Sequence, residues 1–195
     1  MQQSSQNTLY PVFLKLETLS VLIVGGGEVG AEKLRYMLKS SPDANITLVV
    51  ENINEEITKL LSKSRKINLQ LKKYQNSDLK DKNIAIIATD DRALNSLIRD
   101  EAKSRNILVN VADTPELCDF YLGSIVTKGD LKIAISTNGK SPTFAKRFRE
   151  MLEESLPDSI PELLSNLNSF RSKLKGDFKN KVKVLNELTE ELISK

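Results

Sequence analysis

A glycine-rich segment near the start of the chain has the spacing of a loop that binds a dinucleotide. Gly25, Gly27 and Gly30 follow the apolar run 20–24 and precede a stretch whose apolar residues recur at helical spacing. The first glycine permits a tight turn, the second lets the backbone approach a pyrophosphate, and the third lets the helix pack closely on the strand. Unpaired N–H groups at the start of that helix would face the phosphates. The spacing therefore predicts a dinucleotide site here.

Polar residues follow later apolar runs, at positions where an open parallel sheet binds its ligands. Glu51 closes the second run, where its carboxylate can accept hydrogen bonds from the hydroxyls of an adenosine ribose. Such a contact favours NAD over its 2′-phosphorylated counterpart, and the alternative is a solvated loop carboxylate. Thr89 lies where the cofactor would pass, and Asp90 or Asp91 after it is suited to capping a helix.

Asp113 is the carboxylate best placed for acid–base chemistry. It follows the apolar run 107–111 at the mouth of the predicted sheet, and the chain contains no histidine. Proton transfer must then use carboxylates, lysine, tyrosine, cysteine or water, so Asp113 is a candidate general base. The alternative is that its carboxylate caps the turn at 113–116, because aspartate near a proline is common turn chemistry. Position alone leaves both interpretations open.

Composition limits the class of protein and the kinds of site. The chain has 195 residues, a formal net charge of only +3, no apolar run of membrane-spanning length and a polar start unlike a signal peptide. We therefore expect a folded cytoplasmic protein that binds neither membrane nor nucleic acid, with no metal site. The single Cys118 cannot form an internal disulfide and is interpreted as a buried small side chain.

Basic residues gather in the second half of the chain, and two interpretations are open. A charge cluster is usually a solvated face, but a cleft that receives a polyanionic small molecule uses the same residue types. The residues are Lys128, Lys132, Lys140, Lys146, Arg147 and Arg149.

Strands and helices alternate up to residue 113. Apolar runs at 20–24, 46–50, 84–88 and 107–111 predict strands, and the alternation of apolar and polar residues at 67–71 predicts a further short one. Helical spacing between them predicts crossover helices. The helix expected after Asp91 carries Leu94, Leu97, Ile98 and Ala102. The alternation is typical of an α/β Rossmann-type parallel sheet, which we expect over residues 1–113.

The pattern changes after Asp113. Residues 120–126 and 131–136 read as a hairpin, and Pro142 opens a helix that ends near Leu156. We expect a dimerisation hairpin and the start of this helix over 114–150, and a C-terminal helical domain over 151–195 with Gly176 between two helices. A hairpin and amphipathic helices appended to a nucleotide-binding sheet favour a homodimer.

Six ordered motifs lie between residues 9 and 155: Tyr10 to Leu16, Val21 to Val29 with Lys33, Ala88 to Asp91, Val109 to Asp113, Pro115 to Phe120 and Ile133 to Pro142. Together they resemble the precorrin-2 dehydrogenase family, also called the sirohaem synthase N-terminal module. The resemblance implies NAD-dependent oxidation of precorrin-2 to sirohydrochlorin on the way to sirohaem, by a homodimer. Some family members also insert Fe²⁺, so a bifunctional enzyme is the first alternative and an NAD-sensing regulatory domain the more remote one.

The resemblance also implies roles for individual residues. The family's cofactor contacts correspond to Glu28, Val29, Glu51 and Asn52, and its essential aspartate corresponds to Asp113. The candidate substrate-binding residues are Asn110, Thr137, Lys140 and Lys146. Thr137 stands where some members have a phosphorylated serine. Gly30 stands where the family commonly has alanine, and Gly123 where proline is frequent. Thr114 stands where a second acid is frequent, and the missing acid weakens the case for metal insertion.

Overall fold

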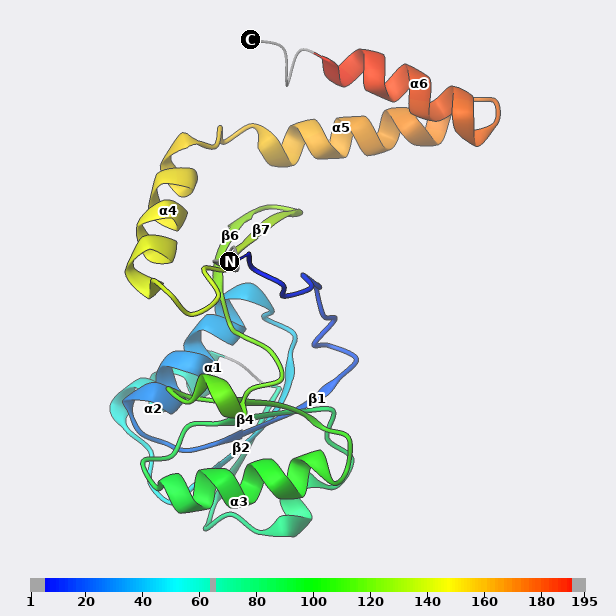
Figure 1. The fold of residues 1–195 in the computed structure, drawn as a ribbon. Helices are drawn as coiled ribbons and strands as arrows, with labels where there is room; N and C mark the ends of the chain where they lie inside the picture. The colour runs from blue at the N-terminus through cyan, green and yellow to red at the C-terminus, as the bar shows by residue number, and fades with distance from the viewer. Residues whose placement is uncertain (1–5, 64–65, 191–195) are drawn as a thin grey trace, which may run out of the picture. The chain divides into compact units, whose positions relative to one another are not determined.

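A parallel β-sheet forms the centre of the N-terminal part of the chain. The computed structural model describes residues 6–63 and 66–190. Its five-stranded sheet has the order β3-β2-β1-β4-β5, and every neighbouring pair is parallel. The strands are β1 (Ser20–Val24), β2 (Asn45–Val50), β3 (Ile67–Leu71), β4 (Ile84–Ile87) and β5 (Leu108–Val111) (Figure 1). This arrangement confirms the predicted Rossmann-type fold.

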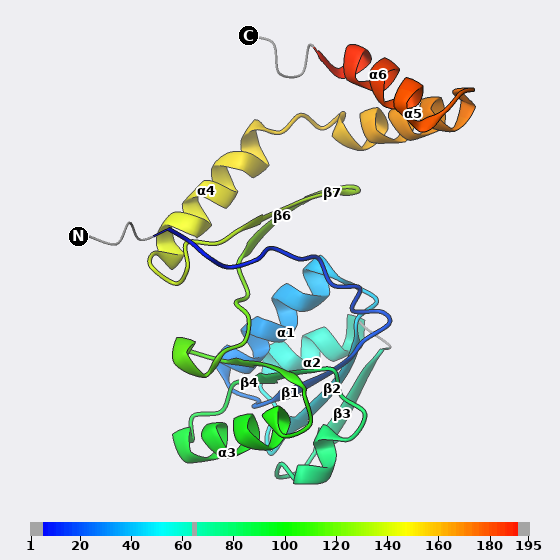
Figure 2. The same ribbon diagram turned by 45° about the vertical axis from the view of Figure 1, so that its right-hand side comes forward.

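Both faces of the sheet are covered by helices, because successive side chains of a strand point to opposite faces. Val21 and Ile23 of β1 pack with α1 (Glu28–Ser40) and α2 (Glu55–Lys63), whereas Leu22 and Val24 pack with α3 (Arg92–Lys103) and the 3₁₀ helix η1 (Asn76–Leu79). Figures 1 and 2 show α1 and α2 on one side of the sheet and α3 on the other. The runs of apolar residues in the sequence reflect this burial on two faces.

The buried face of α3 includes a polar residue. Ile98 and Ala102 are fully buried, the polar Asn95 is buried beside them, and the apolar Leu97 is 52% exposed. Asn95 can be buried because its amide has hydrogen-bond partners on the loop before α3, which compensate for the loss of water.

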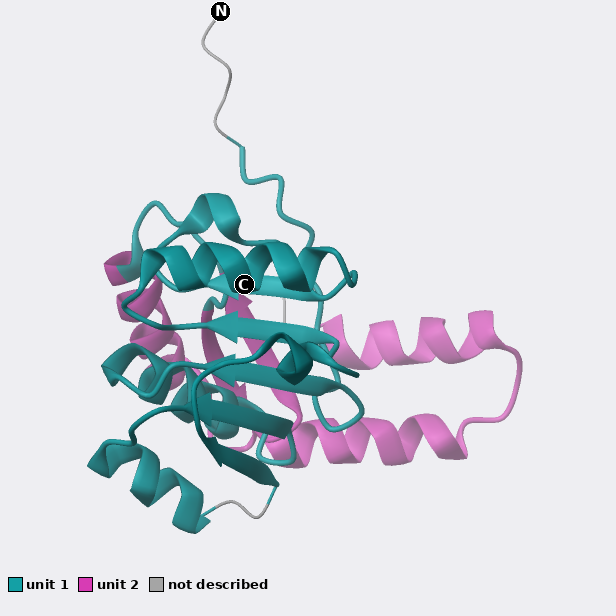
Figure 3. Ribbon diagram, turned by 90° about the horizontal axis from the view of Figure 1, so that it is seen from below, with its two compact units in different colours: residues 1–123, 136–142 teal, residues 124–135, 143–195 magenta. Residues whose placement is uncertain are grey.

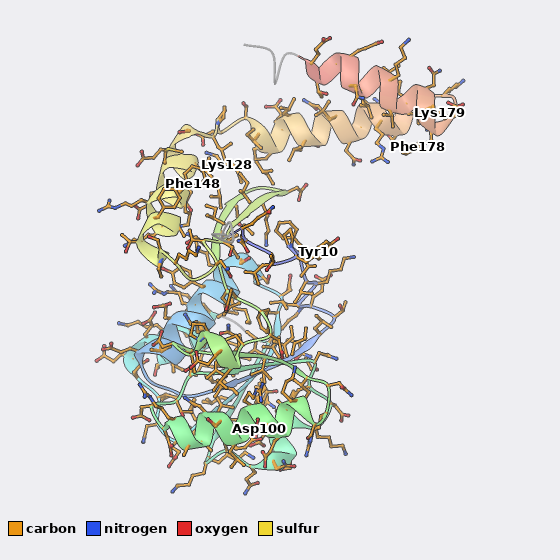
Figure 4. All side chains as sticks on the ribbon, viewed as in Figure 1. Tyr10, Asp100, Lys128, Phe148, Phe178 and Lys179 are labelled. Atoms are coloured by element: carbon orange, nitrogen blue, oxygen red, sulfur yellow. The ribbon has the colours of Figure 1, made fainter. Side chains whose placement is uncertain are left out.

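The hairpin and three helices follow the sheet. Strands β6 (Ser124–Lys128) and β7 (Leu131–Ile135) are antiparallel, and α4 (Pro142–Ser155) begins at the predicted proline. Helices α5 (Ile160–Lys173) and α6 (Phe178–Thr189) are separated by Gly176, whose φ of +113° suits glycine alone. Neither helix has a buried residue, and Phe178 and Lys179 project from the start of α6 (Figure 4).

The first hairpin strand starts later than predicted, at Ser124 instead of Phe120. The cause lies in the preceding residues, which are bound to β5. The Asp119 N–H donates to the Val109 carbonyl at 2.8 Å, and the Asn110 Nδ2 donates to the Phe120 carbonyl at 2.8 Å. The chain is therefore attached to the sheet up to Phe120 and turns into the hairpin only after it.

The chain divides into two compact units (Figure 3). The first comprises residues 1–123 and 136–142, and the second comprises 124–135 and 143–195. In the second unit, the Lys128 Nζ donates to the Leu156 carbonyl and pairs with Asp158, each at 2.8 Å, so the hairpin is tied to the loop between α4 and α5. In the described part of the chain, no helix is long and apolar enough to cross a membrane. The assignment of residues 1–113 to NAD binding, 114–150 to dimerisation and 151–195 to a helical domain stays a prediction.

Candidate functional site

The glycine loop after β1 is closely packed against its neighbours at two of its three motif positions. Gly25 has a φ of +118°, and a Cβ there would lie 2.2 Å from the Ala88 carbonyl oxygen. A Cβ on Gly30 would lie 2.0 Å from the Gly25 carbonyl oxygen. Both distances are shorter than van der Waals contact, so the loop in this conformation leaves no space for a side chain at either position.

Gly27 is different, because the space around it is open. A Cβ there would meet nothing within 4 Å, and Gly27 is the N-cap of α1 without a side-chain cap hydrogen bond. The open space and the uncapped N–H groups at the helix start suit the pyrophosphate of a dinucleotide. The residues present therefore fit the predicted cofactor, with Glu28 and Val29 in the first turn of the helix.

Gly26 has a structural role that the motif does not predict, since the motif leaves this position variable. A Cβ on Gly26 would lie 2.1 Å from the carbonyl oxygen of Asn52, so the loop after β2 approaches the glycine loop closely. The run of three consecutive glycines was the signal available in the sequence. This contact brings Asn52 and the preceding Glu51 beside the glycine loop.

The predicted ligand residues lie at the carboxyl ends of neighbouring strands. Glu51 follows β2, Gly25 follows β1, Thr89 lies two residues beyond β4 and Asp113 two residues beyond β5. With about 4.8 Å between strands, the order of the sheet separates the ends of β2 and β5 by roughly 14 Å. In this order Glu51, the carboxylate predicted to bind the ribose, and Asp113, the candidate base, lie on opposite sides of the glycine loop. An extended dinucleotide requires such a separation.

Asn95 holds Thr89 in place from the buried side of α3. Its Nδ2 donates to the Thr89 carbonyl at 3.0 Å, and the Thr89 hydroxyl donates to the Asn95 Oδ1 at 2.6 Å. Asp91 is the residue that caps α3, since its carboxylate accepts from the N–H groups of Ala93 and Leu94. The sequence does not predict this contact between Asn95 and Thr89, because one polar residue within a helix carries no signal of its partner.

Asp113 has a backbone conformation that few residues adopt. Its φ is +55°, it is exposed, and the Thr114 N–H closes the turn onto the Val111 carbonyl at 3.3 Å. The 3₁₀ helix η2 (Pro115–Leu117) begins without a side-chain cap hydrogen bond. Among residues 6–63 and 66–190, nothing donates to the Asp113 carboxylate or pairs with it. The structure therefore provides no hydrogen bond for the turn-cap interpretation.

Asp119 and Asn110 fasten the segment after Asp113 to the sheet. The Asp119 carboxylate accepts from the Val109 N–H at 2.9 Å and from the Lys103 Nζ at 2.6 Å. Partial burial acts to raise the pKa of Asp119, but the bonds from Lys103 and Val109 outweigh it and hold the pKa below its usual range. In the sequence, Asp119 stands within the motif 115–120 and carries no signal of this role.

We expect Asp119→Asn to lower the free energy of unfolding at pH 7 by about 1–3 kcal/mol, because a charge-assisted pair is lost. The pKa of the folded carboxyl lies below the unfolded value of about 3.9, so its contribution is present above that pH and is lost as the pH falls through the folded value. Urea unfolding of both proteins at neutral and acidic pH measures the difference. A difference that persists undiminished in acid contradicts the charge-based explanation.

Cys118 packs against the core beside β5 and is half-buried. Its Sγ accepts from the Val111 N–H at 3.2 Å and donates to the Val111 carbonyl, also at 3.2 Å. Burial raises the pKa of the thiol, which keeps it protonated at neutral pH. These contacts agree with the predicted structural role.

The candidate substrate residues lie in three places. Asn110 is 6% exposed. Thr137 and Lys140 share one tight turn, in which the Lys140 N–H donates to the Thr137 carbonyl at 3.1 Å, and Asn138 and Gly139 between them have φ values of +53° and +74°. Lys146 is exposed on α4, in the other compact unit.

Comparisons with known proteins agree with this fold and with a domain that binds a dinucleotide. Residues 12–124 match a family described as putative NAD(P)-binding, and residues 128–155 match one described as sirohaem biosynthesis protein central. The five-stranded parallel sheet and the glycine loop thus define an NAD(P)-binding protein of the Rossmann class.

The relatives are sirohaem enzymes. A siroheme synthase of Psychrobacter cryohalolentis is 41% identical over 90% of this chain and 32% of its own length, and one of Pseudoalteromonas atlantica is 36% identical over 89% and 37%. The chain spans about a third of the length of these curated relatives. A solved structure titled SirC, precorrin-2 dehydrogenase, has a TM-score of 0.75 and 28% identity over 92% of this chain and 89% of that one. The chain belongs to the precorrin-2 dehydrogenase family, the N-terminal module of sirohaem synthases.

Proposed function

We propose that this chain oxidises precorrin-2 to sirohydrochlorin, with NAD as the acceptor. The observation that carries the proposal is the Asp113 carboxylate after β5, which has no partner among residues 6–63 and 66–190. It lies in the same sheet whose glycine loop fits a dinucleotide. The likeness to the precorrin-2 dehydrogenase structure supports it, because that likeness spans nearly the whole of both chains.

The oxidation removes one hydride and one proton from carbon and nitrogen positions of the macrocycle. NAD, when bound, supplies the site that accepts the hydride. Asp113 takes the proton, or passes it to water, because its exposed carboxylate has no competing partner in the described chain. Thr89, held by Asn95, orients the cofactor at the end of β4, and the N–H groups of Glu28 and Val29 hold the pyrophosphate.

The substrate carries eight carboxylates, so we propose that basic residues orient it. Lys140 and Lys146 are exposed and cationic, and Thr137 shares the turn of Lys140. The Asn110 Nδ2 is already bonded to the Phe120 carbonyl, so a substrate contact from Asn110 would use its amide oxygen. The homodimer and a cytoplasmic location stay predictions, supported respectively by the apolar residues exposed on α4 and α6 and by the lone thiol.

Iron insertion is the second candidate, favoured by the same free carboxylate. A base that takes protons from the pyrrole nitrogens would serve it, and in that reaction Fe²⁺ is a substrate. Thr114 stands where the family frequently has a second acid, so the case for this activity is the weaker one.

The experiment that tests the proposal is incubation of the purified chain with precorrin-2 and NAD, followed by absorbance spectra. We expect sirohydrochlorin and NADH to appear together in equal amounts. Addition of Fe²⁺ after complete oxidation then tests insertion, against a control without protein because iron can insert unaided. If the chain binds NAD but does not oxidise precorrin-2, the regulatory alternative replaces the enzyme.

A further inference from the structure

A lysine lies beside the carboxylate that is proposed to bind the adenosine ribose. Strands β2 and β3 pair up to Val50 and Leu71, and the Lys72 N–H then donates to the Val50 carbonyl at 2.8 Å. The next residue, Lys73, thereby reaches Glu51, and its Nζ lies 4.0 Å from the Glu51 Oε2. The side chains of Lys73 and Glu51 are 84% and 58% exposed, so both are accessible to a ligand.

The neighbouring lysine is not available in the same way. The Lys72 Nζ donates to Asp78, whose side chain is only 6% exposed and also accepts from the Gln75 N–H. Lys72 therefore belongs to a fixed pair next to η1. Among the described residues, Lys73 pairs with Glu51 alone, at 4.0 Å, and its side chain is 84% exposed, so its ammonium is accessible to a ligand at this corner of the sheet.

We propose that Lys73 determines how well this chain accepts a dinucleotide with a 2′-phosphate, and that Glu51 and Lys73 together set the cofactor preference. Glu51 accepts from the free 2′-hydroxyl of NAD and repels a phosphate at the same position. Lys73 attracts that phosphate and partly offsets the charge of Glu51. The proposal rests on the proposed function only for the position of the dinucleotide at the glycine loop.

The two charges have unequal effects in the native chain. An exposed ammonium on a flexible stem is strongly hydrated and screened, whereas the carboxylate interacts directly with the ribose. We therefore expect the native chain to prefer NAD. Removing the Glu51 charge leaves Lys73 without its partner and turns the corner into a weak phosphate site.

The test is titration of NAD and NADP into the native chain and the Glu51→Gln, Lys73→Ala and double variants. Glu51→Gln keeps the size of the side chain and removes its charge. We expect it to tighten NADP binding about tenfold, and we expect the double variant to lose most of that gain. Lys73→Ala alone should leave NAD affinity unchanged within about twofold. The gain in NADP affinity should also shrink at high salt, because the site is exposed.

Lys66→Ala is the matched control. Lys66 directly precedes β3, whereas Lys73 follows it. The Lys66 Nζ also pairs with a carboxylate, at 2.9 Å from the Asp43 Oδ1. It should not alter the NADP gain of Glu51→Gln. Equal NADP affinities of Glu51→Gln and the double variant would overturn the proposal while leaving precorrin-2 oxidation untouched. Failure of the native chain to bind either dinucleotide would overturn the proposed function, and this proposal with it.

Discussion

Asp113→Ala should slow precorrin-2 oxidation by about 10²–10⁴-fold, the usual contribution of a general base. The chain has no histidine that could replace the carboxylate, and no described group pairs with it. Because the side chain is exposed and unbonded, NAD affinity and the oligomeric state should stay near those of the native chain. Steady-state rates with saturating NAD measure the loss. Any iron insertion should fall in the same variant if one base serves both reactions.

The backbone conformation of Asp113 requires two companion variants. At a φ of +55° an alanine costs about 1–2 kcal/mol of strain, whereas asparagine and glycine adopt this conformation readily. Asp113→Asn and Asp113→Gly therefore remove the carboxylate without that strain. All three variants should lose activity to a similar extent. Near-native turnover in Asp113→Asn, with binding unchanged, would mean that the proton leaves directly to solvent and that Asp113 is a turn residue.

Two alanine substitutions in the glycine loop should lower the free energy of unfolding by very different amounts. Gly25→Ala should destabilise the fold by more than about 3 kcal/mol, since its φ is +118° and the new Cβ would overlap the Ala88 carbonyl. Gly27→Ala should cost about 1 kcal/mol or less, because the new methyl group enters open space and only the helix cap is weakened. Urea unfolding curves distinguish the two.

Gly27→Ala, the variant with the smaller effect on stability, should weaken dinucleotide binding. Gly27→Ala places a methyl group where the pyrophosphate approaches, so we expect NAD affinity to fall about 10–100-fold through the loss of charge-assisted hydrogen bonds. Gly139→Ala is the control for a glycine with open space elsewhere in the first unit, and it should leave NAD affinity unchanged. Full NAD affinity in a folded Gly27→Ala protein would show that the phosphates do not approach this glycine.

Short-range patterns in the sequence sufficed for the strands of the sheet and for the glycine loop. Strands buried on both faces need continuous apolar runs such as 84–87, and the bends at Gly25 and Gly176 need residues that tolerate a positive φ. These requirements act within a few residues, so they are visible in the sequence. They account for the correct prediction of the parallel sheet, the hairpin and the helices after it.

Contacts between distant segments required the tertiary structure. A single polar side chain such as Asn95 or Asp119 looks the same in the sequence whether it is solvated or buried, because its partner is chosen by the fold. The late start of β6 arises from bonds between residues 118–120 and β5, and Lys73 meets Glu51 only through the register of β2 and β3. The order of strands and helices and the predicted position of the cofactor thus follow from the sequence alone, since local geometry decides both. Only the tertiary structure shows that no described residue pairs with Asp113 and which side chains hold its neighbours. The reason is that hydrogen bonds across the sheet depend on how strands far apart in sequence align.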